Sequence, residues 1–541
     1  MKNFLKNADA ILYRKNEKYP GIFVSSQEDI LKAITGLEAS DGAVVVSSEK
    51  SALFVDSRYT FAAKLQTDSN KFEILNLKNN EIVDWIKKNL SEKSNIAFDP
   101  QYYSHEEVDF FAAQLKNYCF TQINLKEVLN IPPEKFDLNI YCIDRESDRI
   151  SCVSETIARN NLDAYLICDP CSIAWLLNIR DLNRKYTPVV LGYLLLTNAG
   201  EEILYLDDRY DSPHDFKFEK DLQSDLLKFE KVGIDKSQTP FHLRHPNFID
   251  LKNPCIFPKS VKNKAEISDI KSAAQKDSLA IINFLRWFYA NTEKIRESDV
   301  VEKLLYFRKQ QDGFIGESFK TIAAADENAA IVHYSPSSQT DKYIDNILLI
   351  DSGGQYKHGT TDITRTISRR EPTSEQKLFY TLVLKGHIAL AGAKFPVGTP
   401  GAQLDPLTRQ FLWQHGVDYN HSTGHGIGYM SHVHEGPVSI SRSSNVPLQA
   451  GMIISDEPGY YPENCFGIRL ENMMSVVEDE REGYLSFETL SLVPFDQKFI
   501  RRDLLTEFEK NWLEEYDQKI AHIFPGARSL STMYKEALQN R

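Results

Sequence analysis

The sequence predicts a mixed α/β (α+β) protein built from three parts. Its 541 residues are too many for a single hydrophobic core. Two successive segments follow the same order of helix, strand and strand hairpin, which indicates two related α/β units. The remainder starts with two long helical stretches and continues as a strand-rich region to about residue 495. We therefore expect domains at 1–137, 138–261 and 262–541.

The first part mixes strands and helices. "DGAVVVSSEKSALFVDSRYT" (41–60) is typical of a strand hairpin, because two β-branched or apolar runs flank "SSEK". "NNEIVDWIKKNL" (79–90) has helical spacing. The proline-rich stretch "NIPPEKFDLN" (130–139) marks the end of this part.

The second part repeats this plan. "DRISCVSETIARNNL" (148–162) predicts an amphipathic helix, "DAYLICD" (163–169) a strand, and "YTPVVLGYLLLTNAGEEILYLD" (186–207) a hairpin. The similarity is one of pattern, without a residue-level repeat. "NPCIFPKSVKNKAEI" (253–267) marks the next boundary.

The third part starts with helices predicted at 265–291 and 297–311, from the spacing of their apolar residues. "LLTEFEKNWLEEYDQKIAHIF" (504–524) also has helical period, with many charges. We expect it to be an exposed amphipathic tail helix.

The composition predicts a cytoplasmic protein. A net charge of −13 argues against nucleic acid or anionic membranes as partners. No apolar run approaches a membrane helix, and the first 21 residues lack the unbroken apolar core of a signal peptide. Seven scattered cysteines suggest reduced thiols. "CDPC" (168–171) has redox-motif spacing, but we favour a strand end followed by a turn.

Two acids occur where strands of the third part begin or end. Ile347 to Ile350 predict a buried strand that ends in Asp351, and "TTDITRTI" predicts a second strand that contains Asp362. A hairpin folded near Tyr356 would bring the two carboxylates together, which is costly without a counter-charge. Alternatively, each accepts backbone hydrogen bonds at a turn.

Two more acids follow the same pattern. The apolar run from Met452 to Ile454 leads to Glu457, and "FGIRLENMMSVV" predicts a strand that contains Glu471. Arg469 lies two residues before Glu471 and so points the same way, and the two could simply form a pair.

Taken together, the four acids predict a metal centre. Two divalent cations neutralise four carboxylates, and paired metals in hydrolases share bridging carboxylates and generate a hydroxide nucleophile at neutral pH. His425, between two glycines in "TGHGIG", can supply one imidazole. Oxygen-rich ligands with one nitrogen suit Mn²⁺ better than a structural zinc site.

The motifs "IDSGGQYKHGTTDITRT", "STGHGIG", "HVHEGP", "SDEPGYY" and "GIRLEN" resemble those of the aminopeptidase P (Xaa-Pro aminopeptidase) family, of the pita-bread metallopeptidases. The resemblance spans nearly the whole chain and implies its long, three-domain type. It implies two creatinase-like N-terminal α/β domains, a catalytic domain with a curved antiparallel sheet, and a homodimer.

The resemblance also implies roles for individual residues. The ligands of two metal ions, usually Mn²⁺, would be Asp351, Asp362, His425, Glu457 and Glu471, with Asp362 and Glu471 bridging. The catalytic groups would be His434 in proton transfer, His421 in binding substrate or stabilising the intermediate, and Arg469 in orienting Glu471. The substrate would be bound by His333, His421, His434 and Tyr461.

Some positions leave alternatives open. His432 is expected to be surface or scaffold, although its spacing from His425 would let it exchange roles with His434. His358 and Ser422 depart from the family pattern, and "EASDG" (38–42) replaces a usual turn. We expect His358 to be an exposed turn residue and the departures to affect substrate preference more than metal binding.

The predicted function is hydrolysis of the N-terminal Xaa-Pro bond of peptides through a hydroxide held by two metal ions. Its partners would be peptides with proline second, and neither nucleic acid nor membrane. A prolidase-like Xaa-Pro dipeptidase is the nearest alternative, since it shares the five ligands. A non-catalytic binding protein or a metal-free creatinase is disfavoured, because all five ligands are present.

Overall fold

The computed structural model describes residues 8–16, 18–19, 28–56, 58–143, 148–211, 216–291, 293–336 and 340–525. Of the first 21 residues, for which the sequence predicts no signal peptide, residues 1–7, 17 and 20–21 lie outside the described residues. The chain forms two compact units. The N-terminal unit comprises Met1–Arg184 and Val189–Cys255, and the C-terminal unit comprises Lys185–Pro188 and Ile256–Arg541.

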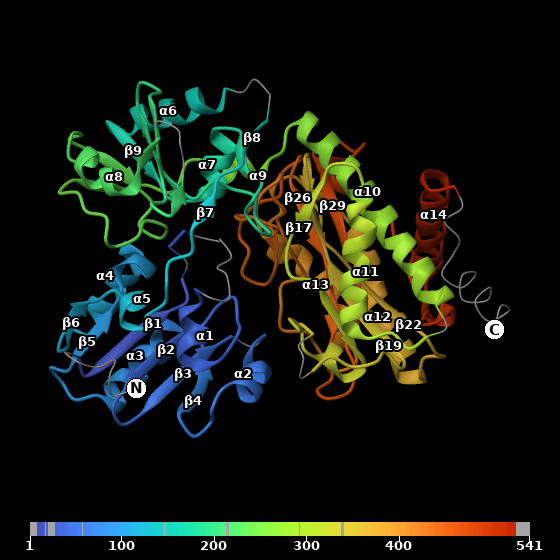
Figure 1. Cartoon of the computed structure of the whole chain (residues 1–541). Coiled ribbons are helices and arrows are strands. Elements are labelled where there is room, and N and C mark those ends of the chain that lie inside the picture. The colour runs from blue at the N-terminus through green and yellow to red at the C-terminus, as the bar shows by residue number, and fades with distance from the viewer. Residues whose placement is uncertain are drawn as a thin grey trace. The chain divides into compact units, whose positions relative to one another are not determined.

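The N-terminal unit contains two six-stranded sheets with the same topology (Figure 1). The strands of the first sheet are, in order, β4 (Phe72–Asn76), β3 (Ser51–Val55), β2 (Ala43–Ser47), β1 (Ala10–Arg14), β5 (Asn95–Phe98) and β6 (Cys119–Gln122). Those of the second sheet are β14 (Lys217–Phe218), β12 (Glu202–Leu206), β11 (Gly192–Thr197), β9 (Ala164–Ile167), β15 (Val232–Ile234) and β16 (Phe248–Asp250).

The two sheets also share their strand directions. In each, a central strand, β1 or β9, pairs antiparallel with the predicted hairpin on one side and parallel with β5 or β15 on the other. The hairpins predicted at 41–60 and 186–207 are β2–β3 and β11–β12. The similarity of pattern therefore extends to the sheets themselves.

Short helices and strands complete the N-terminal unit. The helices are α1 (Ile30–Thr35), α2 (Thr60–Gln66), α3 (Asn79–Asn89), α4 (His105–Gln114), α5 (Leu125–Val128), α6 (Arg149–Arg159), α7 (Pro170–Leu176) and α8 (Glu219–Leu226). Two small ladders join β7 (Phe136–Asp137) to β13 (Tyr210–Asp211) and β8 (Ile140–Cys142) to β10 (Ile179–Asp181).

The turn predicted at "CDPC" was wrong, because helix α7 starts there. The Asp169 side chain accepts hydrogen bonds from the backbone N–H groups of Cys171 and Ser172, and Pro170 occupies the first turn, where its missing N–H costs nothing. Both cysteines of the motif are buried, and burial raises the pKa of Cys168 to about 12. A thiol that stays protonated at neutral pH is a poor redox nucleophile.

The C-terminal unit is built from antiparallel ladders flanked by helices. Its helices are α9 (Ile256–Ser260), α10 (Lys264–Ala290), α11 (Glu297–Lys309), α12 (Ser374–Ala391), α13 (Gly401–Trp413) and α14 (Glu507–Ile523). Its sheets are β17 (Phe314–Glu317)–β20 (Gly354–Tyr356)–β21 (Gly359–Thr360), β18 (Ile322–Ala325)–β19 (Ile347–Ser352)–β22 (Ile363–Ser368), β23 (Lys394–Pro396)–β30 (Tyr484–Thr489)–β29 (Asn472–Glu478)–β26 (Ile453–Asp456), β24 (Gly424–His425)–β25 (Ser439–Ile440) and β27 (Gly459–Tyr460)–β28 (Ile468–Arg469).

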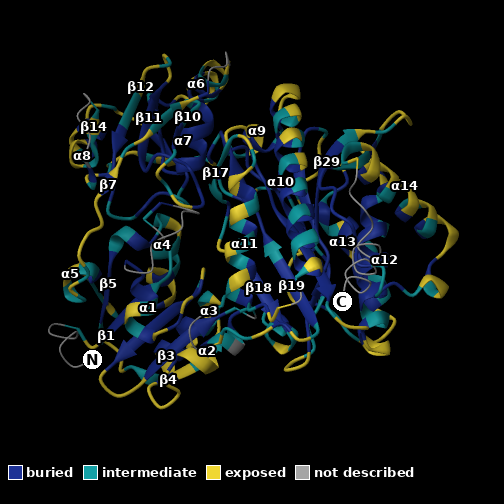
Figure 2. Ribbon diagram, turned by 45° about the vertical axis from the view of Figure 1, so that its right-hand side comes forward, coloured by how far each residue is buried: buried dark blue, intermediate teal, exposed yellow. Residues whose placement is uncertain are grey.

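The long helices cover the buried strands of this unit. Figure 2 shows β19 and β29 buried, whereas α10 and α11 alternate between buried and exposed residues. Helix α10 begins with a capping box, in which Asn263 and Glu266 bind each other's backbone N–H groups. Its apolar residues pack with those of β19 and β22 in the main core of the unit.

The C-terminal helix is less exposed than the sequence suggested. Helix α14 buries Leu513, Tyr516 and Ile520 in the main core. The Tyr516 hydroxyl accepts hydrogen bonds from Arg365 at 2.9 Å and from the backbone N–H of Val493 at 3.1 Å. The expected exposed tail helix was wrong in this respect, because its apolar stripe completes the core.

Candidate metal centre

The β19–β22 ladder brings the first two acids together. Asp351 pairs with Thr364 across the ladder, and the chain reverses between β20 and β21. Gly353 permits this close approach, since a Cβ atom there would lie 1.9 Å from the carbonyl oxygen of Thr361. His358, in the turn, is half exposed, as expected. The hairpin predicted near Tyr356 is therefore present.

A second ladder delivers the other two acids. Asp456 at the end of β26 pairs with Asn472 at the start of β29. Glu457 therefore directly follows the last residue of β26, and Glu471 directly precedes the first residue of β29. Because adjacent antiparallel strands run in opposite directions, both carboxylates lie at the same end of the ladder.

The described residues contain three groups whose potential ligand atoms lie within 4.8 Å of one another: Asp351, Asp362 and Glu471; His425, Glu457 and Glu471; and Asp362, His425 and His434. Asp362, His425 and Glu471 each belong to two groups, and two of these three residues are carboxylates. That sharing is what a pair of metal ions with two bridging carboxylates requires.

The orientation of His425 suits a ligand. Its Nδ1–H donates to the carbonyl oxygen of Gly426 at 2.9 Å. Its Nε2 is then left with a lone pair, 3.4 Å from Asp362 Oδ2 and 3.3 Å from Glu457 Oε1. A hydrogen bond from the far nitrogen of the ring commonly orients histidine ligands.

The electrostatics of the acids call for a cation. Burial raises the pKa of Asp362 and of Glu471, and the neighbouring carboxylates raise both further. Burial also raises the pKa of Glu457. Asp351 Oδ1 and Asp362 Oδ1 are buried and find no hydrogen-bond partner among the described residues. Buried acceptors without donors, held close to like charges, fit divalent cations.

Arg469 is the cation nearest to the acids. Its Nη2 donates to Asp351 Oδ2 at 2.6 Å. Its link to Glu471 passes through Thr364, whose hydroxyl accepts from Arg469 Nε at 3.3 Å and donates to Glu471 Oε2 at 2.7 Å. Arg469 therefore contacts one predicted ligand directly and the other through a threonine.

A hydrogen-bonded chain leads from Arg469 to His421. Arg469 Nη1 donates to the Tyr461 hydroxyl at 2.8 Å, which lies 2.9 Å from His421 Nε2. Burial lowers the pKa of His421 to about 3, and the charge of Arg469 contributes, so its ring is neutral near pH 7. His333 also contributes to lowering this pKa, so its ring lies near that of His421.

His434 and His432 differ in their distance from the centre. The His434 ring is exposed, and its centroid lies 4.3 Å from that of His425, at an interplanar angle of 89°. His432 Nδ1 lies 2.7 Å from the backbone oxygen of His434, and His432 belongs to none of the three ligand groups. His434 therefore belongs to one of the ligand groups, whereas His432 contacts the backbone of His434 and belongs to none of them.

Two residues around the centre, Thr364 and His387, were not predicted from the sequence. Thr364 connects Arg469 to Glu471, and its place on the same strand face as Asp362 could have revealed it. His387, on α12, lies buried with its Nδ1 3.1 Å from Asp456 Oδ2. Nothing in the sequence spacing pointed to His387, because its partner comes from a distant strand.

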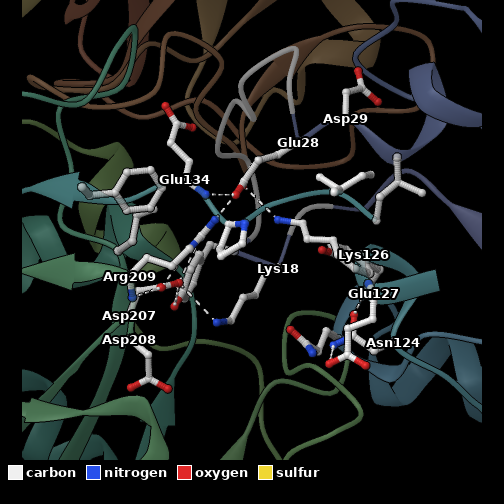
Figure 3. A pocket seen from close by; sticks show the side chains of 18 of the residues that line it. Lys18, Glu28, Asp29, Asn124, Lys126, Glu127, Glu134, Asp207, Asp208 and Arg209 are labelled. Carbon is white, nitrogen blue, oxygen red and sulfur yellow. Dashed lines mark hydrogen bonds and ion pairs between the residues drawn. The ribbon is translucent and has the colours of Figure 1, made fainter. Parts of the chain in front are cut away.

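A pocket in the N-terminal unit offers a contrast (Figure 3). It encloses about 320 Å³. Charged side chains line it, and they pair with one another: Glu28 accepts from Arg209 at 2.6 Å and from Lys126 at 2.9 Å. Asp207 accepts from Lys18 at 3.2 Å and from Tyr19 at 2.8 Å. These acids already have lysine and arginine partners, whereas among the described residues the four acids of the metal centre have an ion pair with one arginine, Arg469, which contacts Asp351.

Four family models match the chain. Metallopeptidase family M24 matches residues 268–478, and the C-terminal region of that family matches 483–525. Creatinase/prolidase N-terminal domains match 12–130 and 139–266. A probable Xaa-Pro aminopeptidase P of Laccaria bicolor is 31% identical over 93% of this chain and 86% of its own length. The chain belongs to metallopeptidase family M24.

Two further relatives match this chain over nearly its whole length. Aminopeptidase P2 of Arabidopsis thaliana is 32% identical over 95% of this chain and 82% of its own length. The crystal structure of an X-prolyl aminopeptidase from Caenorhabditis elegans, described as a cytosolic enzyme with a di-nuclear active site, has a TM-score of 0.90 at 28% identity and covers 99% of this chain and 95% of its own. The expected fold, two creatinase-like domains before a pita-bread domain, is confirmed.

Prolidases match a smaller part of this chain. The prolidase of Pyrococcus furiosus has a TM-score of 0.52 at 26% identity, and covers 62% of this chain and 98% of its own. Among the described residues, no helix is both long and apolar enough to cross a membrane.

Proposed function

We propose that this M24 protein is a metal-dependent Xaa-Pro aminopeptidase, which hydrolyses the bond between the N-terminal residue of a peptide and a proline in second place. The observation that carries this is a set of four buried or partly buried carboxylates and one imidazole with too few counter-charges, in a chain that matches X-prolyl aminopeptidases over nearly its whole length.

The proposed ligands of two divalent ions are Asp351, Asp362, His425, Glu457 and Glu471, with Asp362 and Glu471 shared. Mn²⁺ is the proposed metal, because the donors are oxygen-rich with one nitrogen. Bound here, the ions would polarise the scissile carbonyl and make water acidic enough to attack it near neutral pH.

The protein's own residues would hold the substrate and move protons. Hydrolysis breaks a C–N bond and leaves the proline nitrogen in need of a proton. His434, exposed and edge-on to His425, is the proposed donor of that proton. Imidazole is the side-chain group that most readily takes and returns a proton near neutral pH.

His421 is better suited to positioning than to proton donation. Its Nδ1–H donates to the carbonyl oxygen of Ser422 at 2.8 Å, and its Nε2 accepts from Tyr461. A neutral ring whose single N–H is bound to a backbone carbonyl oxygen is poorly placed to donate a proton to substrate. We propose that His421, Tyr461 and His333 line the substrate site, and that Arg469 fixes Tyr461 and Asp351.

The first experiment is hydrolysis of Arg-Pro-Pro and Arg-Pro by metal-stripped protein, before and after Mn²⁺ is restored. We expect cleavage of the tripeptide only with Mn²⁺. Cleavage of the dipeptide alone would identify a prolidase, the second candidate. Bound metal without cleavage of either would contradict both, and no metal binding would favour a non-catalytic protein.

Two broader properties complete the proposal. We propose that the chain works as a homodimer, as its resemblance to three-domain aminopeptidases P implies. Light scattering should give twice the mass of one chain, and a monomer at all concentrations would contradict this. A cytosolic location is proposed because the X-prolyl aminopeptidase of Caenorhabditis elegans is described as cytosolic.

A further inference from the structure

The loop that carries His434 contains one acidic side chain, and it is buried. In residues 428–437, "GYMSHVHEGP", the only acid is Glu435, which is 4% exposed. His434, its neighbour, is exposed. A side chain anchored inward at 435 therefore directly follows an exposed side chain at 434, in a loop that forms no strand at these two residues.

Two buried lysines hold Glu435. Lys259 Nζ donates to Glu435 Oε2 at 3.0 Å, and Lys262 Nζ donates to Glu435 Oε1. The side chains of Lys259 and Lys262 are 8% and 2% exposed. Burial opposes ionisation of Glu435, but the two lysines outweigh it and hold its pKa below the usual range. A carboxylate buried this deeply would be unstable without such partners.

The lysines are themselves fixed to the strand that leads to Glu457. The backbone N–H of Lys262 donates to the carbonyl oxygen of Gly451 at 2.9 Å, and Val261 forms a β-bridge with Met452. Strand β26 begins at the next residue and ends beside Glu457. The segment that carries the two lysines is therefore bonded to the chain just before β26, and the β26–β29 ladder has Glu457 and Glu471 at its end.

The loop is tied to His425 as well. The backbone N–H of Glu435 donates to the carbonyl oxygen of Gly426 at 2.7 Å. Gln355 Nε2 donates to the carbonyl oxygen of Ser431 at 2.8 Å. Gly426 allows this contact, since a Cβ atom there would lie 2.1 Å from the backbone oxygen of Glu435. These bonds fix the backbone, and the ion pairs fix the direction of the Glu435 side chain.

We propose that Glu435 is a positioning residue for His434: its ion pairs with Lys259 and Lys262 hold the loop 428–437 so that the His434 imidazole stays edge-on to His425. This inference rests on the proposed function, because the proposed function assigns the proton transfer to the His434 imidazole. Glu435 does not touch the centre and acts through its neighbour.

The test compares Glu435→Gln, His434→Ala and the double variant, each as the full-length Mn²⁺-loaded protein. Glu435→Gln keeps the shape of the side chain and removes its charge. We expect kcat to fall by roughly 10- to 100-fold, with KM and Mn²⁺ stoichiometry unchanged, because misplacement of a catalytic group affects the reaction more than binding. In the His434→Ala background, Glu435→Gln should cause no further loss. Wild-type kcat in Glu435→Gln, or independent losses that multiply in the double variant, would overturn the proposal.

Glu509→Gln is the matched control. Glu509 is 6% exposed and accepts from Lys385 at 2.7 Å in the same unit, without being near the loop 428–437 in sequence or hydrogen bonding. It should lose stability and keep kcat. Should Glu435→Gln fail to fold, Lys259→Met keeps the Glu435–Lys262 pair and should lower kcat less.

A second measurement does not depend on activity. Amide hydrogen exchange over residues 428–437 should speed up in Glu435→Gln and in Lys259→Met, and stay unchanged in Glu509→Gln. If the wild-type protein cleaves no Xaa-Pro peptide, the proposed function fails and this measurement still decides whether the ion pairs hold the loop. Unchanged exchange in both variants would overturn the proposal.

Discussion

Two clusters of buried acids in this protein have opposite electrostatics. In the N-terminal unit, burial by itself would raise the pKa of Asp207, yet Lys18 and Arg209 hold it below the usual range. In the C-terminal unit, burial raises the pKa of Asp362 and of Glu471, and the neighbouring carboxylates raise them further. Both clusters contain buried acids, but in the N-terminal cluster lysine and arginine partners lower the pKa of the acid that they contact.

The difference shows why burial of acids does not by itself identify a metal site. The N-terminal acids have enough lysine and arginine partners to be stable as carboxylates. The C-terminal acids have Arg469 on Asp351 and depend on a cation from outside for the rest. The useful criterion is whether the donors and cations already present satisfy the acids.

Asp362→Asn should produce the largest effect. It removes a carboxylate that belongs to two of the ligand groups. We expect loss of bound Mn²⁺ and a fall in kcat/KM of roughly a thousandfold or more, since a bound metal supplies several kcal/mol of transition-state stabilisation. Metal analysis and peptide hydrolysis check this. Full activity with bound metal would remove Asp362 from the proposed ligands.

Asp207→Asn is the counterpart in the N-terminal unit. It leaves Lys18 and Arg209 without the carboxylate that both contact, at 3.2 Å and 2.9 Å. Breaking a buried ion pair typically costs about 3–5 kcal/mol, so the free energy of unfolding should drop by that order. Denaturant unfolding measures it, with the exposed Asp208→Asn as the control. Lost Mn²⁺ binding would contradict the distinction between the two clusters.

Tyr461→Phe should have a smaller effect. The substitution removes the hydroxyl that joins Arg469 to His421 and keeps the ring. We expect kcat/KM to fall by roughly 10- to 150-fold, as for loss of one hydrogen bond to a charged group, with Mn²⁺ binding unchanged. Steady-state kinetics on Arg-Pro-Pro would show this. An unchanged kcat/KM would mean that the chain from Arg469 to His421 is dispensable.

The smallest effect is a change of thermal stability with pH. An acid whose folded pKa is raised stabilises the fold below its unfolded pKa, and this contribution is lost as pH rises through the folded pKa. Raised pKa values at Asp362, Glu457 and Glu471 should therefore make metal-stripped protein progressively less stable as the pH rises above the usual carboxyl range.

Added Mn²⁺ should raise Tm by a few degrees, and the increase should grow over the same pH range, because protons compete with the metal for the carboxylates. Thermal unfolding with and without Mn²⁺ measures both trends. An increase that is constant with pH would indicate that these carboxylates do not hold the metal.

The sequence alone determined the elements that carry the site. Strand periodicity placed Asp351 and Asp362 on one hairpin, although Asp362 directly precedes β22 and does not lie within it as predicted. The order of helix, strand and hairpin predicted two related sheets in the N-terminal unit. These predictions succeeded because they depend on local patterns of apolar residues. The start of α7 was missed although its signal, Asp169 followed by Pro170, is also local.

Only the tertiary structure decided which distant groups meet. Glu457 and Glu471 reach the centre because β26 and β29 pair, and His387 meets Asp456 across separate elements. Lys259 and Lys262 contact Glu435 across sequence separations of 176 and 173 residues. Residue spacing does not encode such contacts, since they arise when the ladders and the core bring remote segments together. The same applies to the shortage of counter-charges around the acids of the metal centre, which depends on every described neighbour and not on the strands near which the acids lie.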